Sequence, residues 1–428
     1  MSSANGNGTA NGLHQPYSRP RVVITGMGAI TPLGHDVQST WDAAVKGTPG
    51  IAKITLFDTS SLDFSIAAEV KNFDPTAHFS AKEVRRMDRV SQLGLVAARQ
   101  AFEDSGLVIT DENSWDVGVV IGCAIGGVST FLAENKVFLE RGPRRISPFT
   151  VPMMLNDTAT GQIALAFRAR GPNLCIVTAC ASGSNAMGEA FELIRAGRAK
   201  AVITGGCEAP IQPFVMSAFV NMGALSIYND TPESASRPFD KTRTGFVTGE
   251  GAGMFVVEDL EHAQARGAKI YAEIIGYGCT DDAHHITAPD VNGPAMAMKL
   301  ALKQAGLQPK DIDYLNAHGT STPLNDVNET RAIKAIFGEA AYDVSISSTK
   351  SMTGHSFGAA GAIEAAMCIK AIQDDVIPPT INYVNADPDC DLNYTPNEAV
   401  RKPVRIAMSN SFGFGGHNGS IILKEYQE

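Results

Sequence analysis

The chain has 428 residues, which exceeds the about 250–300 residues that one hydrophobic core usually serves, so two cores or one duplicated core are expected. With 44% hydrophobic and 19% charged residues, it has the composition of an ordinary globular protein. Its net charge of −10 argues against nucleic acid or an anionic membrane as the main partner, and no apolar run reaches the roughly 20 residues of a membrane span.

The first 18 residues are rich in Gly, Asn and Ser and contain no apolar segment, which predicts a disordered tail and not a secretory signal. The seven cysteines are odd in number, scattered and without a CxxC pair. This pattern predicts free thiols in a reducing compartment, the cytoplasm, with neither disulfides nor a metal site.

Short β-branched runs alternate with helical segments along the chain, which is typical of an α/β protein. The predicted strands, in chain order, are residues 22–25, 119–121, 175–178, 201–204, 253–257, 272–276, 344–347 and 420–423. Several of them lead into loops of glycine and other small residues, where α/β folds place their chemistry.

Cys180 follows the third predicted strand and precedes a helical pattern that stops at Gly197. The apolar residues of that pattern recur at helical spacing: Met187, Ala190, Phe191 and Ile194. A cysteine at a helix N-terminus lies near free backbone N–H groups and a positive dipole end, which favour a thiolate and can hold an oxyanion. Cys180 is therefore the predicted nucleophile.

A second strand, small-residue loop and Ala-rich helix surround Gly358–Ala362, as around Cys180, which suggests two similar halves. We place the boundary near Leu260–Lys269. The predicted division is a tail at 1–18, a half with the nucleophile at 19–265, and a half with candidate catalytic histidines at 266–428.

Two of the nine histidines, His318 and His355, lie in loops of small and hydroxyl residues after apolar strands. A nucleophilic cysteine needs a nearby base or a lowered pKa, and histidine is its usual partner. These two positions, more than the other histidines, are candidates to act with Cys180.

The span from about Arg21 to Lys424 resembles the β-ketoacyl-acyl-carrier-protein synthases of type II fatty acid synthesis, in particular the synthase II group. The matching segments are Thr178–Gly183, Ser236–Asp240, Asn316–Thr322, Ser348–His355 and Asn410–Gly416. The resemblance implies the fold of thiolases, with two similar α/β halves stacked in a five-layered αβαβα core, and a homodimer.

The resemblance also implies an acyltransferase that elongates fatty acids by decarboxylative Claisen condensation. Cys180 would carry the acyl group, and the backbone N–H groups of Cys180 and Phe414 would form the oxyanion hole. His318 and His355 would stabilise the enolate that malonyl-carrier protein leaves on losing carbon dioxide. No external cofactor is implied, because decarboxylation supplies the driving force and phosphopantetheine enters on the carrier protein.

Further residues match supporting positions of the family. Lys350 and Glu329 match a charged pair beside the site, and Phe414 matches a gate over the acyl pocket. The substrate-contacting positions are Thr320 and Thr322, for the pantetheine arm, Ile125, for the pocket wall, and Phe412.

The implied partner is acyl carrier protein, in acyl and malonyl forms, which is strongly acidic and would dock on basic side chains. The matching basic residues are Lys82, Arg85, Arg86, Arg144 and Arg145. One arginine of the family's dock is missing, since Gly223 stands in its place. His417 stands where the family often has threonine, and Ser356–Phe357 replaces an aliphatic pair.

Alternatives remain at this stage. Gly354–Gly358 fits the G-x-S-x-G elbow of serine esterases, with Ser356 as nucleophile and Asp387 or Asp389 and His417 following in order, although no strand directly precedes it. Gly26 and Gly28 after a strand suggest a dinucleotide site, although the third glycine is missing. A non-catalytic partner subunit is disfavoured by Cys180, and a type II polyketide ketosynthase is the nearest alternative.

Overall fold

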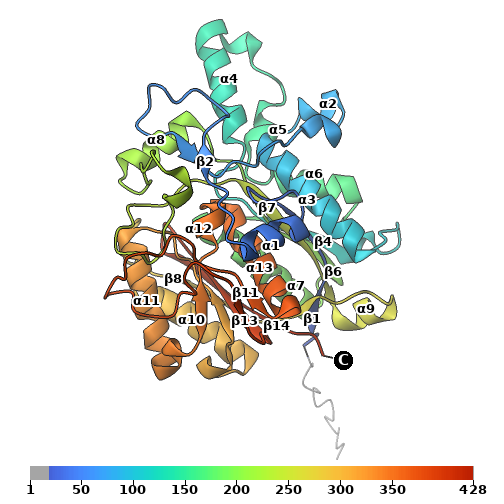
Figure 1. The fold of residues 1–428 in the computed structure, drawn as a ribbon. Helices are drawn as coiled ribbons and strands as arrows, with labels where there is room; N and C mark the ends of the chain where they lie inside the picture. The colour runs from blue at the N-terminus through green and yellow to red at the C-terminus, as the bar shows by residue number, and fades with distance from the viewer. Residues whose placement is uncertain (1–18, 428) are drawn as a thin grey trace, which may run out of the picture.

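The computed structural model describes residues 19–427, so the predicted tail at 1–18 lies outside the described residues. Ten strands form one continuous sheet of two similar parts (Figure 1). From the centre outward, the first part contains β1 (Val22–Ile30), β7 (Gly251–Asp259), β6 (Ala201–Glu208), β4 (Val117–Gly122) and β5 (Asn173–Ile176). The second contains β8 (Ala272–Asp281), β14 (His417–Lys424), β13 (Ile406–Gly413), β9 (Tyr314–Asn316) and β10 (Ser345–Ser347).

The two parts repeat one topology. In each, the first two strand pairs are antiparallel and the last two are parallel. They join where β1 runs antiparallel to β8, with Val22 opposite Ile274 and Ile24 opposite Ala272. The expectation of two similar halves is thus confirmed at the level of strand order and direction.

Helices form three layers around the sheet (Figure 1). On the outer face of the first part lie α3 (Arg89–Ser105) and α6 (Thr158–Phe167), and on that of the second lie α10 (Asn292–Ala305) and α11 (Pro323–Phe337). Between the two parts lie α7 (Ser182–Arg195) and α13 (Ala360–Asp374), which contact strands of both. The predicted five-layered αβαβα core is confirmed.

The central layer is packed through glycines. A Cβ atom on Gly183 would stand 2.7 Å from the carbonyl oxygen of Gly358, and one on Gly206 would stand 2.2 Å from the same atom. Contacts this short leave no room for a side chain, so α7 and α13 sit close to each other and to β6.

Gly26 and Gly28 lie inside β1, where a Cβ atom would stand 2.1 Å and 2.0 Å from carbonyl oxygens of α3. Both glycines therefore permit strand–helix packing and do not form a phosphate-binding turn, so the dinucleotide hypothesis is wrong.

The remaining elements surround this core. The other helices are α1 (Val37–Val45), α2 (Ala81–Val84), α4 (Val128–Arg141), α5 (Thr150–Met154), α8 (Pro213–Asn221), α9 (Leu260–Ala265) and α12 (Lys350–Thr353). Two small pairs of strands join β2 (Ala52–Lys53) to β3 (Ile66–Ala67) and β11 (Val376–Ile377) to β12 (Val400–Arg401). Over residues 19–427, no helix combines the length and the apolar character that crossing a bilayer requires.

Candidate active site

Cys180 lies in a tight turn between β5 and α7. Ala179 adopts a left-handed φ of 48°, and a 3-10 turn over Ala179–Ala181 leads directly into α7. The Ser182 hydroxyl stabilises the turn, because it accepts from the Thr178 N–H at 2.9 Å and donates to the Ala179 carbonyl at 2.7 Å. Cys180 is consequently held at the helix start, as predicted, with only 5% of its surface exposed.

His355 comes from the corresponding region of the second half, after β10 and α12. Its Nε2 atom lies 3.0 Å from the Cys180 Sγ atom. The imidazole stacks on the ring of Phe357 at a centroid distance of 4.7 Å, and its backbone N–H donates to the Val247 carbonyl at 2.7 Å. The ring is thus fixed beside the sulfur.

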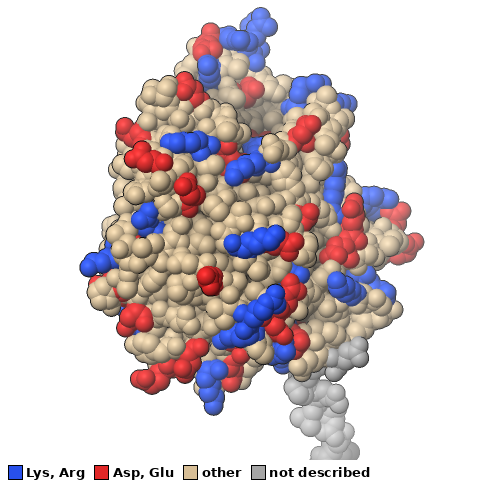
Figure 2. Space-filling view, in the orientation of Figure 1, with Lys and Arg blue, Asp and Glu red and all other residues tan. Residues whose placement is uncertain are grey.

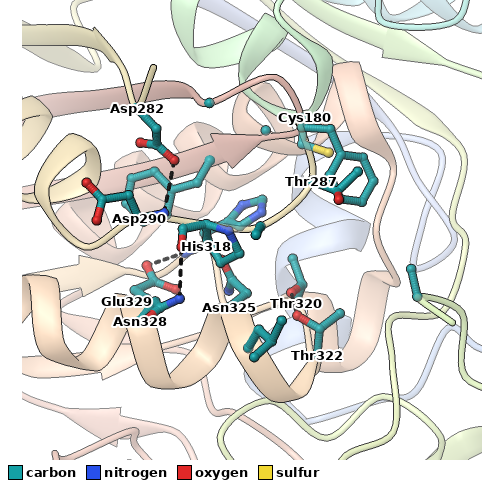
Figure 3. Close-up of a pocket in the computed structure, with 18 of the residues that line it drawn as sticks. Cys180, Asp282, Thr287, Asp290, His318, Thr320, Thr322, Asn325, Asn328 and Glu329 are labelled. Atoms are coloured by element: carbon teal, nitrogen blue, oxygen red, sulfur yellow. Dashed lines mark hydrogen bonds between the residues drawn. The ribbon is translucent and has the colours of Figure 1, made fainter. Parts of the chain in front are cut away.

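His318 follows β9, and its ring centroid lies 5.4 Å from that of His355. The buried carboxylate of Glu329, on α11, accepts from the backbone N–H groups of His318 at 2.8 Å and of Gly319 at 2.7 Å. Figure 3 shows Glu329 beneath His318, with Cys180 on the far side of the cavity. Glu329 therefore fixes the loop that carries His318.

The three side chains are electrically neutral. Burial and the Lys350 ammonium hold the pKa values of His318 and His355 well below the usual range of histidine. Burial raises the pKa of Cys180 to about 12, although Lys350 and the Phe414 N–H act in the opposite direction. The backbone N–H groups at the helix start favour the thiolate, but desolvation outweighs them, so the thiol proton must leave during the reaction.

The resemblance implies that Lys350 and Glu329 form a charged pair, but the structure does not pair them. The Lys350 ammonium bonds the carboxylate of Glu364 on α13, and both side chains are almost fully buried. Glu329 bonds backbone N–H groups instead. The sequence indicated that these residues are close to the site but not which carboxylate neutralises the lysine.

A cavity of about 410 Å³ joins these groups to the surface. It is lined by Cys180, His318 and His355 together with Thr320, Thr322, Gly223, Phe412 and Phe414. The hydroxyls of Thr320 and Thr322 lie 2.9 Å apart on one wall (Figure 3).

The segment Phe412–Gly416 lies across the cavity from His318. The Phe412 ring stands 5.6 Å from the His318 ring, and Phe414 lines the same cavity as Cys180. Gly415 and Gly416 have left-handed φ values of 88° and 82°, so this turn needs glycine. The two residues predicted to supply the oxyanion hole thus line one cavity, and the Phe414 N–H is close enough to the Cys180 thiol to lower its pKa.

Sequence reasoning missed a wall of the cavity formed by residues 282–290. This segment is tied to the Phe414 turn, because the Gly415 N–H donates to the Ile286 carbonyl at 2.8 Å and the Asp282 N–H donates to the Gly416 carbonyl at 2.9 Å. The residues are mixed in type and follow β8 without a recognisable motif, so no local signal marked them.

Two predicted neighbours of the site lie outside the cavity lining. Ile125 packs behind the site, and its N–H donates to Glu208 at 3.2 Å. The Nδ1 atom of His417 lies 3.6 Å from the carboxylate of Asp281, away from the nucleophile.

The serine esterase hypothesis is wrong. Ser356 is buried, Asp387 bonds Arg243 at 2.7 Å, and Asp389 lies 3.9 Å from Arg331. His417, the third member of the proposed triad, pairs with Asp281, so the triad is not assembled.

The predicted docking residues are exposed: Lys82 lies on α2, Arg85 and Arg86 follow it directly, and Arg144 and Arg145 lie on the turn after α4 (Figures 1 and 2). Basic side chains stand out at the top of the molecule in Figure 2, over α4 and α2. The Arg86 guanidinium stacks over the ring of Phe149, in the segment that follows Arg145, at 4.4 Å. We call the five side chains of Lys82, Arg85, Arg86, Arg144 and Arg145 the basic surface.

A five-layered core of two similar halves with a buried Cys–His–His cluster defines the class of thiolase-like condensing enzymes. The chain belongs to the beta-ketoacyl synthase family, since models of its N-terminal and C-terminal domains match residues 19–263 and 271–384.

Relatives support the same assignment. The chain is 53% identical to 3-oxoacyl-[acyl-carrier-protein] synthase 2 of Staphylococcus aureus (strain N315), over 95% of this chain and 99% of the relative. It is 51% identical to the protein of that name from Synechocystis sp., over 96% and 99%. A type II PKS ketosynthase solved with its acyl-carrier protein and bound to the hexaketide is 34% identical, with a TM-score of 0.88 over 96% of this chain and 100% of that chain.

Proposed function

We propose that this protein is a β-ketoacyl-acyl-carrier-protein synthase of the synthase II type. It elongates fatty acids by condensing malonyl-carrier protein with an acyl group held on Cys180. The observation that carries the proposal is the 3.0 Å contact between Cys180 Sγ and His355 Nε2 inside a cavity that His318 also lines.

In the first half-reaction, Cys180 attacks the thioester of the acyl-carrier protein. The thiol proton passes through His355 Nε2 to the departing pantetheine thiolate, so the acyl–sulfur bond of the carrier breaks as that of Cys180 forms. The N–H groups of Cys180 and Phe414 stabilise the tetrahedral oxyanion, which is the largest single contribution expected in acyl transfer.

In the second half-reaction, malonyl-carrier protein loses carbon dioxide and leaves an enolate. The neutral imidazole of His318 donates a hydrogen bond to the enolate oxygen, as does that of His355 once its ring proton has moved from Nδ1 to Nε2. The enolate carbon attacks the acyl carbonyl on Cys180, the product leaves, and the Cys180 thiolate takes up one proton. Decarboxylation drives the step, so no external cofactor is required.

The fatty acid assignment is favoured over a type II polyketide ketosynthase by the curated relatives. The synthase 2 enzymes are 51–53% identical to this chain, whereas the polyketide ketosynthase is 34% identical. An assay with saturated acyl-carrier proteins of graded chain length separates the two functions.

Incubation with acyl-carrier protein should leave one acyl group on the protein. Mass spectrometry of the intact chain and of its peptides should find that group on Cys180 and report the chain length retained. An acyl group on another residue, or none at all under turnover, would contradict the proposed function.

The basic surface is the proposed dock for the carrier protein, whose acidic helices it complements. The double variant Lys82→Glu, Arg85→Glu should raise the KM for acyl-carrier protein about tenfold and leave turnover of a small pantetheine-like thioester unchanged. The matched control, Lys303→Glu with Lys310→Glu, changes the same charge on the exposed surface of α10 and the turn after it. Steady-state kinetics at low salt measure both; equal effects of the two pairs would reject this dock.

A second copy of the chain is the proposed partner in a homodimer. Within residues 19–427, β5 pairs with β4 alone, and Leu174 of β5 and Val177 after it are 43% and 52% exposed. An open strand edge with exposed apolar side chains is a template for pairing with another chain.

The proposed location is the cytoplasm. The seven cysteines are free thiols, which agrees with a reducing compartment.

A further inference from the structure

Glu208, the last residue of β6, is a buried carboxylate that the reaction above does not use. Its Oε2 atom accepts from the backbone N–H groups of Ala124 at 2.7 Å and Gly358 at 3.1 Å, and its Oε1 atom accepts from that of Ile125 at 3.2 Å. Ala124 and Ile125 follow β4 in the first half, whereas Gly358 belongs to the second. One carboxylate thus joins two loops from different halves.

The same arrangement holds a candidate catalytic residue in the other half. Glu329 accepts from the N–H groups of His318 and Gly319, the second and third residues after β9. Ala124 and Ile125 are the second and third residues after β4, the strand that corresponds to β9 in the repeated topology. Glu208 therefore does for the loop after β4 what Glu329 does for the loop that carries His318.

The two loops that Glu208 joins both reach the nucleophile. Ala124 packs on the apolar cluster that contains Cys180 and Phe357. Phe357, the neighbour of Gly358, has a strained left-handed φ of 44° and stacks on the His355 ring. A shift of either loop would move the apolar wall behind the sulfur or the ring beside it.

We infer that Glu208 is a positioning residue that fixes the apolar wall formed by Ala124 and Phe357 beside Cys180, and thereby sets which acyl chains Cys180 accepts. The inference rests on the proposed function, because the wall matters only if Cys180 carries an acyl group. Glu208 bonds no reacting atom; it acts through the loop of Ala124 and through Gly358, the neighbour of Phe357.

The burial of this carboxylate is costly, which argues against a simple packing role. Desolvation raises the pKa of Glu208 to about 7, and the three N–H donors offset only part of that effect. Its only charge-free alternative of similar shape, glutamine, would turn an NH₂ group toward backbone N–H donors. A carboxylate is the side chain that can accept from both loops at once.

Glu208→Gln tests the inference, with Glu258→Gln as the matched control. Glu258 is an equally buried carboxylate with several donors, among them Arg266 and His262, but it lies at the opposite end of the β6–β7 pair. Seven residues of strand separate the two ends, which is roughly 23 Å. The experiment measures thermal unfolding and the kcat/KM for acyl-carrier proteins of graded chain length, together with acylation of Cys180 in the wild type.

Both variants should unfold at lower temperature, but only Glu208→Gln should change the ratio of kcat/KM between long and short acyl chains, by about tenfold. An unchanged ratio in folded Glu208→Gln, or an equal change in Glu258→Gln, would overturn the inference. If Glu208→Gln does not fold, Glu208→Asp tests the inference instead. Aspartate keeps the charge but is too short to reach both loops, so this variant should change the ratio of kcat/KM in the same way. A wild type that does not acylate Cys180 would instead reject the proposed function.

Discussion

Replacement of Cys180 by alanine should abolish condensation, with a fall in kcat/KM of at least about 10³-fold, because the covalent route through the thioester is lost. The variant should fold normally, since alanine fills most of the space of a buried thiol and Ser182, not the sulfur, stabilises the turn. Condensation is measured as β-ketoacyl product formed from acyl-carrier and malonyl-carrier protein.

The control for this experiment is Cys390→Ala, another fully buried thiol, which lies in a separate apolar cluster. It should retain wild-type activity. Cys279 is exposed and will react with iodoacetamide as well, so alkylation is best followed in a Cys279→Ser background. In the Cys279→Ser variant, loss of activity should parallel labelling of Cys180. Inactivation with the label on another cysteine would contradict the assignment of Cys180 as the nucleophile.

Replacement of Cys180 by glutamine should separate the two half-reactions. The amide side chain imitates an acylated sulfur, so acyl transfer stops while malonyl-carrier protein still loses carbon dioxide. In this background, His318→Ala or His355→Ala should lower the rate of decarboxylation about 10²–10⁴-fold, because each removes a buried donor to the enolate oxygen.

Release of carbon dioxide from labelled malonyl-carrier protein measures this step without any condensation. Phe412→Leu is a useful comparison, since it alters the neighbour of His318 without removing a hydrogen-bond donor. Decarboxylation that survives in both histidine variants would exclude the proposed roles of the imidazoles. A Cys180→Gln protein that is inert in both steps would show that the half-reactions are not independent.

The local order of the site could be predicted from the sequence. The strand before Cys180, the helix after it and the small residues between them are contiguous, so their spacing carries the information. The predicted strands all overlap observed ones, although β1 continues to Ile30, beyond the predicted range of residues 22–25. Glycines that permit packing against α3 resemble glycines of a turn when only the sequence is read.

Pairings between separate elements could not be predicted. Lys350 bonds Glu364 on α13, not Glu329 on α11, and the residues around Lys350 do not indicate which of the two carboxylates it meets. Glu208 was not singled out, since its donors are 84, 83 and 150 residues away. The raised pKa of Cys180 could not be predicted for a related reason: the helix start is a local feature, whereas the burial that opposes it comes from the whole fold.

The glycine contacts of the central layer restrict how such a protein can evolve. Gly183, Gly206 and Gly358 meet at distances that admit no side chain, directly beneath the nucleophile. Substitution there would separate the two halves, so these positions are closed to gradual change. At the rim of the cavity, by contrast, Met222 is half exposed, so a substitution there can alter contacts with the substrate without dismantling the catalyst.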